Sequence, residues 1–220
     1  MTLTPNTYFR EVPKTVDMDI RSELHSLNEY TFTVAVILSA QATDKKVNEV
    51  TPALFAIADT PEKMLMLGED ELKKHIKVIS FFNNKAKNIM AMSAMLVGAY
   101  KGQGSDWVFP KKYHNLAELM KLPGVGQKTA NVVMNVCWGA PNIGVDTHVY
   151  RLAHRFGWVD STDNTPEKVE AKLLAVIPKK FHAMVNHVMV LHGRYTCKAQ
   201  RPQCANCPVA KWCNAPDRVI

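Results

Sequence analysis

The chain has 220 residues, 47% of them hydrophobic, which is enough to bury one large core or two small ones. Lys and Arg number 27 against 20 Asp and Glu, and the net charge of +7 permits a polyanionic partner without naming it. No apolar run approaches the roughly 18 residues of a membrane span, and the first residues lack the order of a signal peptide, so we expect a soluble, cytoplasmic protein with no membrane partner.

The first half of the chain shows the apolar spacing of helices. Residues 1–18 carry Pro5 and Pro13 and little amphipathic pattern, so we expect an arm with one weak helical turn. The apolar run at 30–38 has the composition of a strand, but its length favours a helix capped by Asn28. A helix is predicted over 44–58, with Asp44 as its cap. A short helix should run from Thr60-Pro61 to Gly68, another short helix from there to about Lys77, and a long helix over 85–100. Residues 101–114 are rich in Gly, Ser, Pro and Lys and predict a flexible connection.

Two aromatic residues stand in the predicted loop at 79–84, beside turn-forming asparagines. Exposed aromatic side chains on a loop can wedge between DNA bases. The alternative is that they fill the core beneath the loop, which we favour for Phe82, whereas Phe81 fits either role.

The stretch at 122–133 reads Leu-Pro-Gly-Val-Gly-Gln-Lys-Thr-Ala-Asn-Val-Val and predicts a helix, a hairpin and a second helix. Pro123 ends the preceding helical pattern, and Gly124 and Gly126 permit a tight turn and close backbone approach. The first-turn N–H groups of the second helix suit a phosphate oxygen, so a nucleic-acid backbone is the first candidate ligand. Lys128 would lie in that turn, where a cation opposes the helix dipole and a neutral amine would be a nucleophile. The alternative is a solvated surface lysine.

Two commoner glycine motifs do not fit this stretch. A P-loop needs Gly-Lys-Thr contiguous, but Gln127 intervenes and Leu122 stands where the first glycine is required. A dinucleotide fingerprint follows a strand, whereas apolar residues recur at helical spacing from Leu116 to Leu122. Neither ATP nor a dinucleotide is therefore implied.

Residues 145–151 begin another helix, with Asp146 as its N-cap. Capping alone would explain this carboxylate, but close to a substrate it can also stabilise developing positive charge. Because no histidine shows paired metal-ligand spacing, only His148, beside Asp146, is kept as a site candidate. Helices over 166–177 and 179–194 follow, and no convincing strand occurs anywhere, so we predict an all-α fold.

Four of the five cysteines crowd together near the C-terminus and predict metal ligation in a reducing compartment. They are Cys197, Cys204, Cys207 and Cys213. Only Cys204 and Cys207 form a close pair, so spacing alone leaves a structural zinc ion and an iron–sulfur cluster both open. Either group would cross-link and stabilise a loop that has few apolar residues to form a core of its own.

Taken together, these motifs resemble bacterial endonuclease III over roughly residues 23–213. The resemblance rests on the hairpin at 122–133, Val-Asp-Thr-His at 145–148, Ser-Ala-Gln-Ala-Thr-Asp at 39–44, Leu-His-Gly-Arg-Tyr-Thr-Cys at 191–197 and the cysteine spacing. It implies a base-excision-repair DNA glycosylase and AP lyase of the helix-hairpin-helix type. Such an enzyme removes oxidised pyrimidines from double-stranded DNA and cleaves 3′ of the abasic site through a Schiff base and β-elimination. The resemblance also implies a 4Fe–4S cluster on the four cysteines.

The same resemblance assigns roles to individual residues. Lys128 would be the nucleophile and Asp146 the catalytic carboxylate. The residues expected to contact DNA are Gln41, Phe81, Gly124, Val125, Gly126, Gln127, His148, Lys198, Arg201 and Lys211. Two helical domains would flank a DNA-binding cleft: a six-helix domain over 24–137 with the helix-hairpin-helix, and an iron–sulfur cluster domain over 1–23 and 138–220. We expect a bacterial monomer, associated with the nucleoid through DNA.

The chain departs from the family pattern in three places. Gln127 stands where a basic residue is more usual, Ser80-Phe81-Phe82 replaces the usual loop sequence before Asn83, and the arm before Ser22 lacks the expected amphipathic pattern. Two other hypotheses concern the same motifs. A mismatch adenine glycosylase shares the hairpin, aspartate and cluster but typically lacks the lysine, and a non-catalytic DNA-binding module would make Lys128 incidental.

Overall fold

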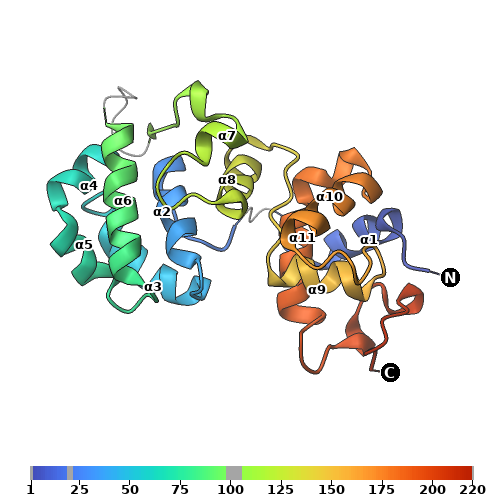
Figure 1. Ribbon diagram of the computed structural model, residues 1–220. Helices are drawn as coiled ribbons and strands as arrows, with labels where there is room; N and C mark the ends of the chain where they lie inside the picture. Colours follow the sequence, from blue (N-terminus) through green and yellow to red (C-terminus); the bar gives the residue numbers. More distant parts are fainter. Residues whose placement is uncertain (1, 19–21, 98–105, 220) are drawn as a thin grey trace. The chain divides into compact units, whose positions relative to one another are not determined.

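The computed structural model describes residues 2–18, 22–97 and 106–219 (Figure 1). Every regular element in these ranges is a helix, so the predicted all-α fold is confirmed. The chain divides into two compact units, Ser22–Trp138 and a unit built from Met1–Arg21 with Gly139–Ile220. The domain boundaries predicted from the sequence lie after residues 23 and 137. None of the helices in the described ranges has the length and apolar character that a membrane span needs.

The continuous unit, Ser22–Trp138, is organised around helix α2. Its helices are α2 (Glu29–Ser39), α3 (Asp44–Phe55), α4 (Pro61–Leu67), α5 (Glu69–Ile76), α6 (Phe82–Leu96), α7 (Leu116–Leu119) and α8 (Gln127–Trp138). Every side chain of α2 from Tyr30 to Leu38 is buried, and α3, α6 and α8 pack against it. A helix that is apolar on all faces is stable only when other helices surround it, which explains the central place of α2.

The segment before the hairpin is packed rather than free where the structure describes it. Trp107 is 1% exposed and Phe109 is buried beside it. The carboxylate of Glu29 accepts one hydrogen bond from the Phe109 backbone N–H at 2.7 Å and another from the Trp138 indole N–H at 2.9 Å. The prediction of a flexible connection is therefore wrong for residues 106–114, and its first part, 101–105, lies outside the described residues.

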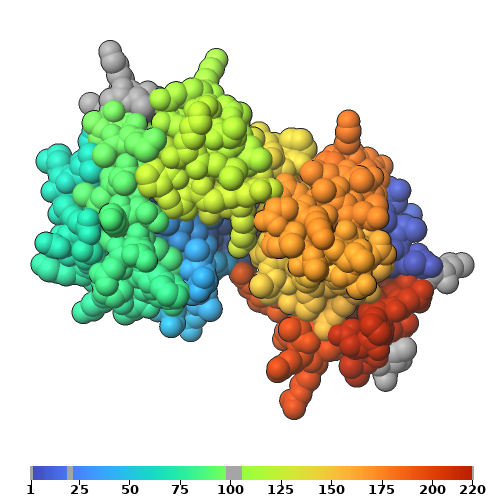
Figure 2. Space-filling model, viewed as in Figure 1, coloured from blue at the N-terminus to red at the C-terminus, as the bar shows by residue number. Residues whose placement is uncertain are grey.

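The discontinuous unit brings the two ends of the chain into one core. Its elements are α1 (Pro5–Glu11), α9 (Thr147–Arg155), α10 (Pro166–Val176), α11 (His182–Leu191), a π-helical turn (His192–Thr196) and short 3₁₀ turns. Figure 2 shows the N-terminal residues, in blue, lying beside the orange and red C-terminal part. Side chains of α1, α9, α10 and α11 share one hydrophobic cluster.

The N-terminal arm is a helix, which corrects the prediction of one weak turn. Thr4 caps α1 by accepting the Thr7 backbone N–H, and Pro5 occupies its first turn. Tyr8, Phe9 and Val12 are buried. The arm belongs to the core of the discontinuous unit because its aromatic face packs there.

Most predicted helix boundaries match the structure. Asn28, Thr60 and Asp146 cap helices through their side chains, as predicted, and Thr165 caps α10 in the same way. The cap of α3 is Thr43 rather than Asp44, because the Thr43 hydroxyl accepts the Lys46 N–H and Asp44 is already helical. Helix α6 begins at Phe82 rather than Lys85 and ends at Leu96, earlier than the predicted end at about Tyr100. The predicted helix over 179–194 is divided into a 3₁₀ turn, α11 and the π-helical turn.

Candidate functional site

The hairpin of 122–126 is a tight turn that requires glycine at its centre. The Leu122 carbonyl accepts the Val125 N–H at 3.0 Å, and Gly124 has a φ of +81°. A Cβ at Gly124 would lie 3.1 Å from the Cβ of Asn88 on α6 and 3.5 Å from the Cδ1 of Ile37 on α2. The turn thus packs directly on two helices, and a side chain at position 124 would be strained and crowded.

Helix α8 starts immediately after this turn and presents Lys128. The Gly126 carbonyl accepts the Ala130 N–H at 2.9 Å, which makes Gln127 the first helical residue. Lys128 is exposed in the first turn, whereas Ala130 is buried. The Val125 side chain is 5% exposed, so only its backbone can reach a ligand. Backbone N–H groups at a helix start, with an exposed amine next to them, form a plausible contact surface for a phosphodiester.

Two of the predicted DNA-contacting residues in the unit Ser22–Trp138 have left-handed backbone conformations although neither is a glycine. Gln41, in the loop after α2, has a φ of +55°, and Phe81, just before α6, has a φ of +58°. Both residues are exposed, and Phe81 is 61% exposed. Phe82 is only half-buried. Left-handed conformations are uncommon outside glycine and concentrate at functional sites.

Asp146 is held at the start of α9 by its own unit. Its Oδ1 accepts the backbone N–H groups of His148 and Val149, both at 2.9 Å. Two residues earlier, Gly144 exchanges a pair of hydrogen bonds with the Asn186 side chain on α11, at 2.8 and 2.6 Å. The segment that leads into α9 is thereby fixed. The Asp146 carboxylate is positioned both by its own capping hydrogen bonds and by the hydrogen bonds between Gly144 and Asn186. Lys128 and Asp146 belong to different units.

His148 is oriented by the same helix. Its Nδ1 lies 3.2 Å from the Nη2 of Arg151, one turn later, and that guanidinium also donates to the Gly193 carbonyl at 2.8 Å. Arg151 carries a fixed positive charge, so it donates to the imidazole nitrogen, which must be the unprotonated one. His148 can then offer only its other nitrogen to a ligand.

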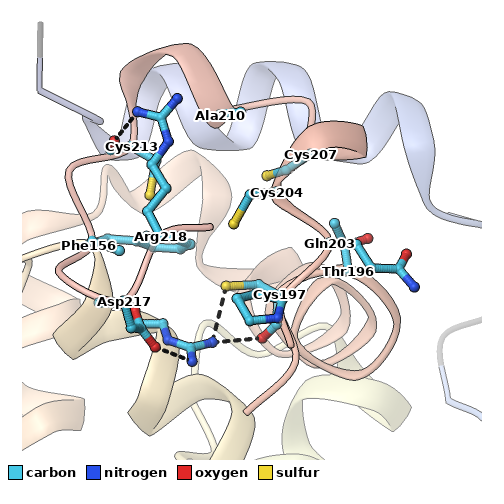
Figure 3. Close-up of a pocket in the computed structure, with 13 residues that line it drawn as sticks. Phe156, Thr196, Cys197, Gln203, Cys204, Cys207, Ala210, Cys213, Asp217 and Arg218 are labelled. Atoms are coloured by element: carbon cyan, nitrogen blue, oxygen red, sulfur yellow. Dashed lines mark hydrogen bonds and ion pairs between the residues drawn. The ribbon is translucent and has the colours of Figure 1, made fainter. Parts of the chain in front are cut away.

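The four predicted metal ligands line one pocket (Figure 3). The sulfur atoms of Cys197, Cys204, Cys207 and Cys213 are turned toward the same space. No three of the described His, Cys, Asp and Glu side chains come close enough to hold a single metal ion. Four thiols that face one pocket are ligands of the kind that hold a zinc ion or an iron–sulfur cluster.

Comparison with known proteins agrees with these features. Residues 34–179 match the family model of the HhH-GPD superfamily base excision DNA repair protein. Endonuclease III of Rickettsia conorii is 48% identical over 88% of this chain and 88% of its own length, and that of Escherichia coli is 40% identical over 90% and 89%. The chain belongs to the endonuclease III family.

Solved structures of endonuclease III give the same assignment. A trapped endonuclease III–DNA covalent intermediate aligns with a TM-score of 0.80 and 40% identity, covering 97% of each chain. A non-covalent endonuclease III–DNA complex aligns with a TM-score of 0.81 and 40% identity, covering 97% of this chain and 96% of that one.

A buried histidine links the N-terminal helix to the cysteine pocket. The Nδ1 of His192 lies 2.9 Å from the Tyr8 hydroxyl, and its Nε2 lies 3.4 Å from the Cys207 sulfur. Burial lowers the pKa of His192 to about 4 and raises the pKa of Tyr8, so the ring is neutral and the phenol protonated near pH 7. A Cys207 thiolate can only accept, so Nε2 would carry the ring proton and Nδ1 would accept from Tyr8.

This role of His192 was not predicted from the sequence, because His192 shows no paired metal-ligand spacing. The available signal was its place in the Leu-His-Gly-Arg-Tyr-Thr-Cys stretch, five residues before the first cysteine. Nothing in the sequence pattern pointed to Tyr8, which is far away along the chain.

Arg155, which the sequence analysis also missed, organises the first part of the cysteine loop. Its guanidinium donates to the carbonyls of Cys197 at 3.1 Å and Lys198 at 2.6 Å, and it lies 3.5 Å from the Cys197 sulfur. It also pairs with Asp217, near the end of the chain. A fixed cation beside a ligand sulfur favours the thiolate that metal binding requires.

The predicted phosphate contacts on the cysteine loop differ in their surroundings. Arg201 is exposed and has a φ of +52°. Lys211 is exposed and lies 4.0 Å from the centre of the Trp212 ring. Lys198 is half-buried, with its carbonyl held by Arg155. All three residues belong to the loop from Cys197 to Cys213 that carries the four cysteines.

Proposed function

We infer that this protein is a base-excision-repair DNA glycosylase and AP lyase that acts on oxidised pyrimidines. The observation that carries this conclusion is the exposed Lys128 in the first turn of α8, immediately after the glycine turn, in a chain of the endonuclease III family. In a non-catalytic binding module an exposed lysine beside the phosphate-facing turn would serve only as a further phosphate contact, whereas in this family it serves as the nucleophile. A mismatch adenine glycosylase, as described above, typically lacks this lysine.

Lys128 supplies the nucleophile of the proposed reaction. The damaged nucleotide is extruded from the duplex, and the amine nitrogen bonds to C1′ of the sugar as the glycosidic bond breaks. The electron pair of that bond leaves with the base, which takes one proton of the amine. The C1′–O4′ bond of the sugar then breaks as the imine forms, and O4′ takes the second amine proton and becomes a hydroxyl. Removal of a proton from C2′ then expels the 3′ phosphate by β-elimination. The result is a strand cleaved 3′ of the abasic site.

Asp146 supplies the negative charge that this chemistry needs. Positive character develops at C1′ as the base departs, and a carboxylate stabilises it. One oxygen of Asp146 is occupied by two backbone N–H groups, so its position is fixed before substrate binds. Preorganised charge of this kind costs no reorganisation during the reaction.

We assign DNA contacts from the same family resemblance. The backbone at Gly124, Val125 and Gly126, with Gln127, would hold a phosphate, and Gln41 and Phe81 would occupy the space left by the extruded nucleotide. Further contacts would come from His148, Lys198, Arg201 and Lys211. The protein would act as a monomer on nucleoid DNA in the bacterial cytoplasm, with a helix-hairpin-helix domain over 24–137 and a cluster domain from the rest.

The four cysteines would hold a 4Fe–4S cluster. Burial raises the pKa of the Cys207 thiol to about 11 and that of the Cys197 thiol above its usual value, so metal binding would release protons from the pocket. When bound, the cluster cross-links a loop that is otherwise held by short 3₁₀ turns. The His192 N–H and the Arg155 guanidinium would face its sulfur ligands.

The function is tested with duplex oligonucleotides that carry a single thymine glycol. We expect base release and a nick whose 3′ end bears the unsaturated aldehyde of β-elimination, with no cleavage of undamaged duplex. Borohydride should trap a covalent complex on an abasic duplex. Binding without release, nicking or trapping would instead identify a non-catalytic DNA-binding module.

The cofactor is tested by absorbance and metal content. We expect brown protein that absorbs near about 400 nm and contains about four irons per chain. Cys207→Ser should lose the colour and lower the melting temperature. Cys137→Ser is the matched control, because Cys137 lies in α8 of the other unit and should leave the spectrum unchanged. Colourless protein containing one zinc ion would contradict the assignment.

A further inference from the structure

Two exposed residues in left-handed conformations lie at the ends of different helices. Gln41 follows the end of α2, and Phe81 precedes the start of α6. They are the only non-glycine residues with positive φ in the described part of Ser22–Trp138. Forty residues separate them along the chain, yet the proposed function requires both side chains to act at one vacated nucleotide. Something must therefore fix one segment relative to the other.

Lys85 connects these two segments through hydrogen bonds at both of its ends. Its ammonium donates to the carbonyl of Leu38 at 2.8 Å and to that of Ala40, the residue before Gln41, at 2.5 Å. Its backbone N–H donates to the Phe81 carbonyl at 3.1 Å. One residue thus contacts Phe81 itself and the peptide bond that leads into Gln41.

The environment of Lys85 is unusual for a lysine. The residue is 6% exposed, although lysine is rarely buried without a partner. Its charge is matched by carbonyls at the C-terminal end of α2, where the helix dipole is negative. Burying an ammonium is costly, and a neutral side chain of similar size would pack there without that cost. Retaining the charge therefore points to a requirement beyond core packing.

The same helix junction supports the phosphate-facing turn. Gly124 packs against Ile37, one residue before Leu38, and against Asn88, three residues after Lys85. A shift of α6 along α2 would displace Phe81 relative to Gln41. It would also disturb the residues on α2 and α6 against which the hairpin packs. The contact between α2 and α6 that Lys85 stabilises therefore supports three segments to which we assign DNA binding: the loop at Gln41, the turn at Phe81 and the hairpin at Gly124.

We propose that Lys85 is a positioning residue that holds Gln41 and Phe81 in register for insertion into damaged duplex DNA. This inference rests on the proposed function. Lys85 does not touch the reacting atoms and acts only through the two segments it joins. Its loss should weaken the extrusion of the nucleotide from a duplex but leave the chemistry of Lys128 intact.

The test compares duplex with single-stranded abasic DNA, because single-stranded DNA has no opposite base or stack to replace. Initial rates of borohydride trapping are measured on both substrates for wild type, Lys85→Met, Lys85→Arg and Lys87→Met. Lys87 is the matched control, since it lies in the same helix but is exposed. For Lys85→Met we expect trapping on duplex to fall by about tenfold or more, with single-strand trapping within about twofold of wild type. Lys85→Arg should recover most of the loss, and Lys87→Met should resemble wild type.

Coupling to the two insertion residues provides the second readout. In a Gln41→Ala, Phe81→Ala background, adding Lys85→Met should change duplex trapping by less than about twofold, because its effect runs through those side chains. An equal loss on both substrates, or a full additional loss in the double-alanine background, would overturn the proposal in favour of a general stabilising role. If Lys85→Met does not fold, Lys85→Gln is measured in the same way, since it keeps donors on a shorter neutral side chain. Wild type that traps neither substrate would overturn the proposed function itself, and this inference with it.

Discussion

Lys128→Ala is expected to abolish borohydride trapping on abasic DNA and to reduce strand cleavage by roughly a thousandfold or more, because the amine that forms the imine is lost. The side chain is exposed and α8 packs through other residues, so the melting temperature should hardly change. Affinity for an abasic-site duplex should stay within about threefold, since the backbone of the glycine turn remains in place. Trapping is measured by gel mobility of the covalent complex, and affinity by fluorescence anisotropy at fixed salt.

The control must remove a lysine without removing the proposed nucleophile. Lys74 suits this purpose because it is exposed in α5 of the same unit and pairs with Glu71. Lys74→Ala should trap and cleave as wild type does. Full trapping by Lys128→Ala would show that another amine forms the imine, and the assignment of Lys128 would fail.

Local signals account for the parts of the fold that were predicted from the sequence. Thr60-Pro61 and Thr165-Pro166 place a capping hydroxyl before a proline in the first helical turn, and both mark helix starts in the structure. Thr4-Pro5 has the same signature, yet only one weak helical turn was predicted for the arm. Its short helix has no long amphipathic pattern, and its stability comes from packing against distant residues such as Trp158.

The candidate site likewise consists of local motifs that the sequence predicts and of distant contacts that it does not. The glycine turn, the capping aspartate and the cysteines are local motifs, and the sequence contains all the information needed to find them. The partners that hold them are not local: Lys85 meets a carbonyl 45 residues away, and Tyr8 meets His192 across 184 residues. Such contacts depend on how helices pack, and neither composition nor periodicity reports a side chain that donates to a distant backbone carbonyl.

Asp146→Asn is expected to separate catalysis from stability. Asparagine keeps a side-chain oxygen that can accept the N–H groups of His148 and Val149, so α9 remains capped. The substitution removes the negative charge, and turnover should fall by roughly 100- to 1000-fold while DNA affinity stays near that of wild type. The measurement is a single-turnover rate of base release from thymine glycol duplex, together with a melting curve.

Alanine substitutions provide the matched comparison. Asp146→Ala should lose turnover and also about 1 kcal/mol of stability, because the cap is removed. Thr165→Ala removes a cap of the same kind from α10 in the same unit, where no catalytic role is assigned. It should lower the melting temperature by about 2–4 °C and leave base release unchanged. If Asp146→Asn released the base as fast as wild type and Thr165→Ala do, Asp146 would be a cap and nothing more, and the positive charge at C1′ would need another partner.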